Sequence, residues 1–141
     1  MKKIVVNKCY GGFDLSFDAV MRYAEIKGIA IFAYIQPGFR EDFVKIKASP
    51  SREKNPVGVI YYTLKDMGRK IDTLYSSFKD CFSVNDLERD DPALVQVVEE
   101  LGKKANSTYS ELVITEIPDG VKWEIGEYDG QEWVEEAHKR W

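Results

Sequence analysis

A chain of 141 residues is long enough for one domain with its own core, and 44% apolar with 31% charged residues exclude a disordered or fibrous protein. Twenty basic against 24 acidic residues give a net charge of −4, which argues against duplex nucleic acid as a partner. No apolar run approaches the roughly 20 residues that cross a bilayer, and the run after Met1 is too short for a signal peptide. We therefore expect a single cytosolic domain over residues 1–141, without a membrane partner and without a disulfide.

The N-terminal part predicts two strands that flank a helix. Residues 2–8 form a short apolar strand, and Gly11 and Gly12 mark a turn. After a helix, residues 28–35 are almost wholly apolar, as expected of a strand buried on both faces. This order favours a parallel, right-handed crossover between the two strands.

Two helices have clear sequence signals at their ends. The first runs over residues 17–27, capped by Ser16 and ended by Gly28 in a left-handed conformation. The second begins at Asp91-Pro92, an acidic cap followed by a proline at the first helical position, and runs to about residue 105.

The middle of the chain is the least regular part. Residues 36–55 carry two prolines and several basic residues, and we expect an exposed excursion in which residues 43–47 form an edge strand. Residues 57–64 are β-branched and aromatic, and they predict a central strand. Residues 66–87 have weak periodicity, so the whole excursion spans about residues 36–88.

The C-terminal part predicts a hairpin followed by a helix. Residues 111–117 and 121–128 alternate as strands, joined by a turn at residues 118–120. Residues 131–141 place apolar side chains four positions apart from Trp133 onward, which indicates a terminal helix. The expected fold is therefore α+β or α/β, with a single central mixed sheet of about five strands and about three helices.

Residue types that support catalysis are few. Cys9 lies beside the glycine turn, and His138 is the only histidine, so a thiol-dependent or phosphodiesterase-like enzyme would have to use these two side chains. The simpler interpretation makes Cys9 a small apolar residue and His138 a surface residue. Two cysteines far apart and one histidine match no zinc-binding spacing, so we expect no metal and no cofactor.

The loop from Tyr10 to Phe13 has the character of an anion site. It follows a strand and precedes a helix, where free backbone amides and the helix dipole favour negative charge, and its aromatic residues could stack on a base. It is neither a Walker loop nor a dinucleotide-binding fingerprint, and two glycines are often simply a turn. Arg89, before the second helix, either grips a phosphate or pairs with neighbouring carboxylates.

Three blocks of the sequence resemble a family of small phage and prophage proteins. They read IVVNKCYGGFxLS at residues 4–16, RxDPALVxVVEELG at residues 89–102, and IPDGVxWEIxEYDG with WVxExHxxW at residues 117–141. Together they cover about half of the chain. The characterised branch that they resemble is the first type of phage Thoeris anti-defence protein.

This resemblance implies a molecular sponge and not an enzyme. Proteins of that branch bind cyclic ADP-ribose isomers, which are made by TIR-domain defence enzymes, and do not cleave them. Some members also sequester cyclic oligonucleotides of CBASS defence at separate sites in a hexamer built of dimers. For this chain the resemblance implies a homodimer or a hexamer (trimer of dimers) in the cytoplasm of an infected bacterial host.

We combine this expectation with local chemistry to name candidate ligand-binding residues, chosen as aromatic, glycine, arginine or amide positions. They are Cys9, Tyr10, Gly11, Gly12, Phe13, Arg22, Arg89, Asn106 and Arg140. A second set, Arg40, Arg52, Lys54 and Lys65, could form a positive mouth that attracts an anion. The alternative function is a protein–protein inhibitor that acts directly on a host enzyme through Trp133 and Trp141.

Overall fold

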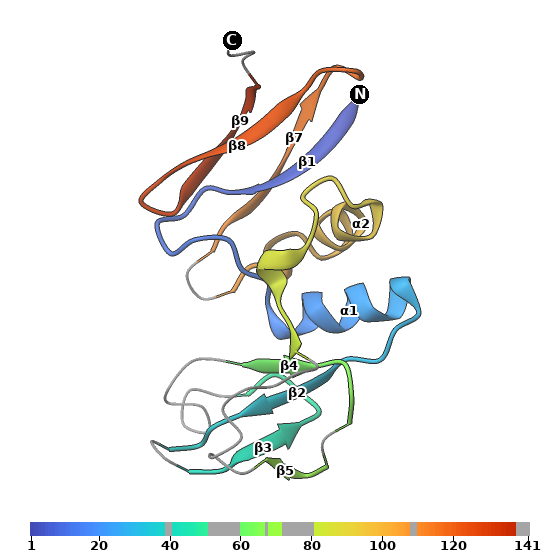
Figure 1. The fold of residues 1–141 in the computed structure, drawn as a ribbon, viewed down its shortest axis with the longest axis vertical. Coiled ribbons are helices and arrows are strands. Elements are labelled where there is room, and N and C mark those ends of the chain that lie inside the picture. The colour runs from blue at the N-terminus through green and yellow to red at the C-terminus, as the bar shows by residue number, and fades with distance from the viewer. Residues whose placement is uncertain (39–40, 51–59, 67, 72–80, 108–109, 138–141) are drawn as a thin grey trace. The chain divides into compact units, whose positions relative to one another are not determined.

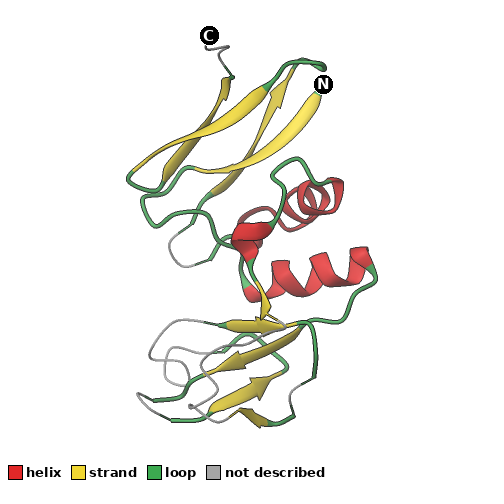
Figure 2. Ribbon diagram, in the orientation of Figure 1, coloured by secondary structure: helices red, strands yellow, loops and turns green. Residues whose placement is uncertain are grey.

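The computed structural model describes residues 1–38, 41–50, 60–66, 68–71, 81–107 and 110–137. Over these residues the chain forms two α-helices, two 3-10 helices and nine strands (Figure 2). The prediction of mixed α and β structure is confirmed. The prediction of one central sheet with three helices is wrong, because the described strands form three sheets, one of five strands and two of two strands, and all of their pairings are antiparallel. None of the described helices is long and apolar enough to span a bilayer.

The chain divides into two compact units. Unit 1 contains Met1–Tyr23 and Val84–Trp141, and unit 2 contains Ala24–Ser83. Unit 2 is therefore one continuous segment inserted between the two segments of unit 1. The predicted irregular excursion over residues 36–88 falls largely within unit 2, where the described residues form a sheet of their own.

In unit 1 the N-terminal strand β1 (Lys2–Asn7) pairs with β7 (Leu112–Ile117), and it confirms the predicted strand. Three successive residues of β1, from Ile4 to Val6, are fully buried although they alternate between the two faces. Helix α2 (Pro92–Leu101) packs against β1 and β7, and β9 (Gln131–Glu136) lies along β1 (Figure 1). The predicted parallel crossover to residues 28–35 is wrong, because those residues belong to a different sheet.

A second pair of strands in unit 1 forms a hairpin. Strand β8 (Trp123–Tyr128) turns at Asp129 and Gly130 into β9. The predicted hairpin around residues 118–120 is wrong because β7 pairs with β1 instead of β8. The predicted helix over residues 131–141 is also wrong, since its described part is mostly β9. Apolar residues four positions apart fit the even period of a strand as well as a helix, so the spacing does not discriminate.

The main chain of Arg89 and the side chains of Arg89 and Glu132 complete the outer edge of β1. The Val5 amide donates to the Arg89 carbonyl (2.8 Å), and the Asn7 amide donates to the Glu132 carboxylate (2.9 Å). The Arg89 guanidinium donates back to the Val5 carbonyl (3.3 Å). These bonds satisfy main-chain groups of β1 that point away from β7.

Helix α1 (Phe17–Lys27) has the predicted bounds and the predicted cap. The Ser16 hydroxyl accepts a hydrogen bond from the Ala19 amide (3.1 Å), which satisfies a free donor of the first turn. Gly28 follows in the left-handed conformation, with φ +68°, as predicted.

Helix α2 (Pro92–Leu101) begins as predicted and ends earlier. The Asp91 carboxylate accepts from the Ala93 amide (2.9 Å) and from the Tyr23 hydroxyl (2.8 Å). Burial and the Asp91 carboxylate raise the pKa of Tyr23. The last predicted turn is a 3-10 helix, η2 (Gly102–Ala105), because Gly102 has a positive φ of +56° that ends the α-helix. A second 3-10 helix, η1 (Val84–Asp86), opens the segment that leads to α2.

Unit 2 is built on a five-stranded antiparallel sheet of short strands. Its members are β2 (Phe32–Ile35), β3 (Phe43–Ile46), β4 (Tyr61–Thr63), β5 (Lys70–Ile71) and β6 (Cys81–Phe82), in the order β5-β3-β2-β4-β6. The predicted edge strand over residues 43–47 is not at an edge, because β3 lies between β5 and β2. The predicted central position of the strand in residues 57–64 is confirmed for the described residues, and residues 51–59 lie outside them.

The core of this sheet is aromatic. Tyr34 is fully buried and packs with Phe43, Phe32 and Tyr61. The rings of Phe43 and Tyr61 meet edge to face, with centroids 4.8 Å apart. The Tyr34 hydroxyl donates to the carbonyl of Gly68 (2.8 Å), so the one polar atom of the buried ring is satisfied.

Candidate functional site

The candidate site is the loop from Cys9 to Phe13, which leaves β1 and leads towards α1. Tyr10 is 66% exposed, and Gly11 is exposed beside it. The Gly12 amide closes a turn on the Cys9 carbonyl (3.5 Å). Apart from its chain neighbours, no atom lies within 4 Å of the position that a Cβ of Gly12 would occupy, so this side of Gly12 is open to a ligand.

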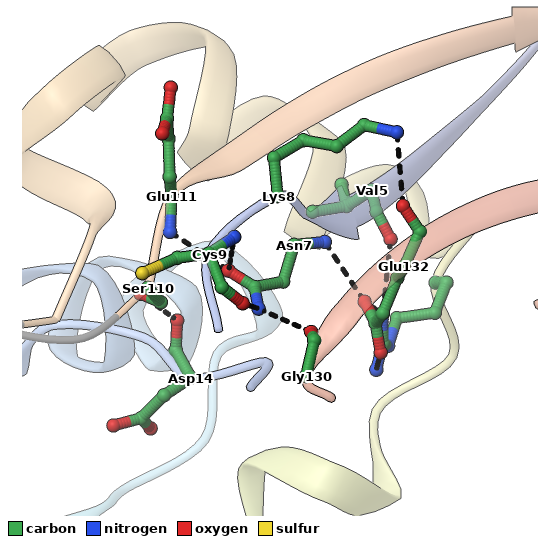
Figure 3. Close-up of polar contacts among 10 residues, drawn as sticks. Val5, Asn7, Lys8, Cys9, Asp14, Ser110, Glu111, Gly130 and Glu132 are labelled. Carbon is green, nitrogen blue, oxygen red and sulfur yellow. Dashed lines mark hydrogen bonds and ion pairs between the residues drawn. The ribbon is translucent and has the colours of Figure 1, made fainter. Parts of the chain in front are cut away.

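Asn7, the last residue of β1, anchors the first part of the loop. Its side-chain amide donates to the carbonyls of Cys9 (2.6 Å) and Gly130 (2.8 Å), and its side-chain oxygen accepts from the amides of Cys9 (3.2 Å) and Glu111 (2.8 Å) (Figure 3). This fully buried side chain therefore uses both donors and both acceptor positions. Because all of its hydrogen-bonding positions are used, the Asn7 side chain fixes the loop, the β8–β9 turn and the residue before β7 relative to one another.

The turn of the β8–β9 hairpin packs directly onto the loop. A Cβ at Gly130 would overlap the Tyr10 carbonyl and the Gly12 amide, so only glycine allows this approach. Gly130 also has a φ of +88°, a conformation that side chains disfavour. The side-chain amide of Gln131 donates to the Lys8 carbonyl (3.3 Å) and adds a second contact between hairpin and loop.

A buried ion pair lies behind the loop. The Arg89 guanidinium makes two hydrogen bonds to the Glu132 carboxylate, at 2.6 and 2.8 Å, with side chains that are 16% and 7% exposed. The same guanidinium lies 3.5 Å from the centroid of the Phe13 ring. Arginine suits this place because its planar fork can bind a carboxylate with two donors while it stacks on a ring.

This pairing limits what Arg89 offers to an anion. Its positive charge is matched by Glu132, and a phosphate would have to compete with a bidentate carboxylate for the same donors. Arg89 was expected either to grip a phosphate or to pair with a neighbouring carboxylate. It does pair with a carboxylate, but this belongs to Glu132 and not to the residues next to Arg89 in the sequence. Asp90 pairs with Lys2 (3.5 Å), and Asp91 caps α2. The loop therefore offers an anion the main-chain amide of Gly11 and the Tyr10 ring.

The structure brings together Cys9 to Phe13 and Arg89, and it places the other candidates elsewhere. Arg22 forms a bidentate pair with Glu100 (2.8 and 3.1 Å). Together with Gln96, this pair lowers the pKa of Glu100 to about 2. The Asn106 side chain accepts from the Leu112 amide (2.8 Å) and so serves the local backbone.

Several predicted residues cannot be placed at the loop. Arg140, with His138 and Trp141, lies outside the described residues, as do Arg40, Arg52 and Lys54 of the proposed positive mouth. Lys65 is exposed and belongs to unit 2. Within the described ranges, no group of three or more His, Cys, Asp or Glu side chains is arranged to hold a metal.

Three residues of the site were missed by the sequence analysis. Asn7 carried a signal, since it is a polar residue at the end of an apolar strand. Gly130 carried a signal as well, since a glycine after an aspartate marks a turn. Glu132 carried no usable signal, because its segment was interpreted as a helix and its inward position depends on the strand register.

Comparison with protein-family models, with curated proteins and with solved structures finds no match to this chain.

Proposed function

We propose that the protein is a phage anti-defence sponge. It captures a cyclic nucleotide immune signal at the Cys9–Phe13 loop and holds it unchanged. The first ligand class is the cyclic ADP-ribose isomers made by TIR-domain enzymes, and cyclic oligonucleotides of CBASS defence are the second. The observation that carries the proposal is the exposed, anchored loop, with an open backbone at Gly12 next to the exposed Tyr10 ring.

The chemistry of the loop suits a flat, anionic ligand. The Tyr10 ring offers a stacking surface for adenine, and the main-chain amide of Gly11 offers a donor to a phosphate. The Asn7 and Gly130 contacts hold the loop before a ligand arrives, which lowers the entropy that binding costs. Because Arg89 is paired with Glu132, the proposal assigns phosphate binding to the backbone and gives Arg89 a supporting role.

Tight capture requires more surface than one exposed loop provides. A sponge competes with a receptor, and nanomolar affinity corresponds to about −12 kcal/mol. Sites with such affinity enclose most of the ligand surface. The proposal therefore includes a homodimer or hexamer in which a second subunit closes over the loop.

An incubation and denaturation assay tests the proposal. The purified protein is mixed with cyclic ADP-ribose isomers and with cyclic di- and trinucleotides, and the filtrate is analysed by mass spectrometry before and after heating. We expect depletion of at least one ligand and its recovery intact on denaturation. Recovery of altered products would indicate an enzyme, and no depletion would favour the protein–protein inhibitor.

Two pairs of variants locate the ligand on the loop. Tyr10→Ala removes the exposed ring and should weaken capture, whereas Tyr10→Phe keeps the ring and should not. Gly11→Asp places a negative charge beside the proposed phosphate, and Gly11→Asn has the same shape without the charge. If both members of each pair bind equally well, the ligand does not occupy this loop.

A further inference from the structure

The outer face of the β8–β9 hairpin carries exposed aromatic rings. Trp133 is 39% exposed and Tyr128 is 75% exposed. In the register of the hairpin, Trp133 stands opposite Gly126, and Tyr128 stands opposite Gln131. Since opposite residues share a face and alternate residues do too, these side chains lie on one face together with Glu124 and Glu135.

Trp133 is held flat against the hairpin. A Cβ at Gly126 would overlap the indole ring, so the missing side chain lets the ring lie over the backbone of β8. The indole nitrogen donates to the Glu135 carboxylate (2.9 Å). One face of the ring is thus fixed against the strand, and the other remains available as a platform.

Within the two strands that carry this platform, every charged side chain is acidic, and the nearest lysine along the chain is Lys122, just before β8. The segment from Trp123 to Glu136 contains six acidic residues and no lysine or arginine. On the inner face Glu132 stands opposite Glu127 and is neutralised by Arg89. On the outer face Glu124 stands directly opposite Glu135, and no ion pair links either of them to a described lysine or arginine.

Two like charges directly opposite each other destabilise a pair of strands. The outer pair therefore has an unfavourable interaction that a cation from outside would remove. A guanidinium is the best fit, because it can stack on an indole ring and donate to two carboxylates at once.

We propose that the outer face of the β8–β9 hairpin docks an extended, arginine-bearing segment of a protein partner. The arginine stacks on Trp133 and bridges Glu124 and Glu135. From this pair to Tyr128 the patch extends about 14 Å, at roughly 3.4 Å per residue, which matches several residues of extended chain and exceeds one small cation. The proposal uses residues outside the Cys9–Phe13 loop and does not depend on nucleotide binding.

Fluorescence anisotropy of a labelled heptapeptide with alternating arginine and serine tests this proposal on the full chain. We expect salt-sensitive binding, and no binding of a matched peptide with glutamate in place of arginine. Trp133→Ala should weaken binding at least about fivefold, as should Glu124→Gln. Glu135→Gln keeps an acceptor for the indole nitrogen and should weaken binding by a similar factor.

A control variant separates the docking face from general electrostatics. Glu116→Gln on β7 changes the net charge by the same amount and should leave binding unchanged. Equal losses for Glu116→Gln and Glu124→Gln would overturn the proposal, and so would an absence of arginine-peptide binding by the wild-type chain.

A second copy of the chain is the competing occupant. If light scattering shows an oligomer that Trp133→Ala converts to a smaller species, this face is a self-interface and the proposal of a foreign segment is wrong. Thermal unfolding supplies a further readout, because Glu124→Gln should raise the Tm of the free protein while it weakens peptide binding. An unchanged or lower Tm would contradict the repulsion on which the proposal depends.

Discussion

The two units of the chain are stabilised by different kinds of interaction. Unit 1 contains a buried ion pair between Arg89 and Glu132, and a buried Asn7 with four hydrogen bonds. Unit 2 contains an aromatic cluster around Tyr34 and Phe43. Each group in a hydrogen-bonded polar network needs a specific partner in a specific geometry, whereas the stability of aromatic packing depends mainly on buried area and shape.

The units also differ in how far along the chain their contacts reach. The bond from Asn7 to Glu132 joins positions 125 residues apart, whereas the bond from Tyr34 to Gly68 spans 34 residues. The candidate loop is therefore assembled only when both ends of the chain are present. Unit 2 closes within one continuous segment. The site therefore depends on polar contacts between residues that are far apart in the sequence. Substitutions of these residues test that dependence.

The largest expected effect is on the buried ion pair of unit 1. Arg89→Met leaves the Glu132 carboxylate buried without its partner and should lower the free energy of unfolding by about 3–5 kcal/mol. Urea denaturation measures this loss. The double variant Arg89→Met/Glu132→Gln removes the unpaired charge and keeps an acceptor for the Asn7 amide, so it should recover a large part of the stability. A single-variant loss below about 1 kcal/mol would show that the pair does not stabilise unit 1.

A matching substitution tests the aromatic cluster of unit 2. Phe43→Ala removes a buried ring and should cost about 3 kcal/mol, whereas Phe43→Leu retains most of the volume and should cost less than about 1.5 kcal/mol. The same denaturation experiment compares the two variants. Equal effects of both would mean that ring packing is not the main source of stability in this sheet.

A smaller effect is expected at the start of α2. Asp91→Ala removes the cap of the helix and the acceptor of the Tyr23 hydroxyl, and it should cost about 1–2 kcal/mol. Asp91→Asn keeps the capping oxygen and should retain most of the stability. If Asp91→Ala lowered the free energy of unfolding as much as Arg89→Met, the local cap would stabilise unit 1 as much as the ion pair does. The conclusion that long-range polar contacts dominate in unit 1 would then be wrong.

The smallest expected effect is a pH dependence at the surface of unit 1. Arg22 lowers the folded-state pKa of Glu100 to about 2, against an ordinary value of 4.5. The carboxylate therefore contributes stability that is fully present above about pH 4.5 and is lost as the pH falls towards 2. Unfolding free energies measured between pH 5 and pH 2 should show a shallower decline for Glu100→Gln. Glu116→Gln serves as the charge-matched control, and an identical slope in both variants would remove Glu100 as the cause.

The sequence predicted the elements that depend on neighbouring residues. Both α-helices begin where a capping side chain precedes an apolar stripe, at Ser16 and at Asp91, because a cap acts within one turn. The strand β1 was also predicted, since a short apolar run between lysines has few alternatives. The glycine loop after it was predicted for the same reason, as turn chemistry is local.

Strand partners were not predictable in this way. The order of apolar segments favoured a crossover from β1 to residues 28–35, but β1 pairs with β7 about a hundred residues further on. The C-terminal strand β9 was taken for a helix because its apolar spacing fits both periods. For this reason only one part of the site could be predicted. Its loop is local, whereas Glu132, which determines what Arg89 can bind, is placed by the β9 register.

The contacts that complete the outer edge of β1 have a consequence for solubility. A strand with unoccupied main-chain donors and acceptors can recruit the same strand of another molecule, and growth from such edges leads to fibrils and precipitates. Arg89 occupies the Val5 amide and carbonyl, and Glu132 occupies the Asn7 amide, so β1 does not present these three groups to another copy. A substitution of Arg89 keeps its main-chain carbonyl but frees the carbonyl of Val5, so turbidity in concentrated solution should precede any loss of secondary structure.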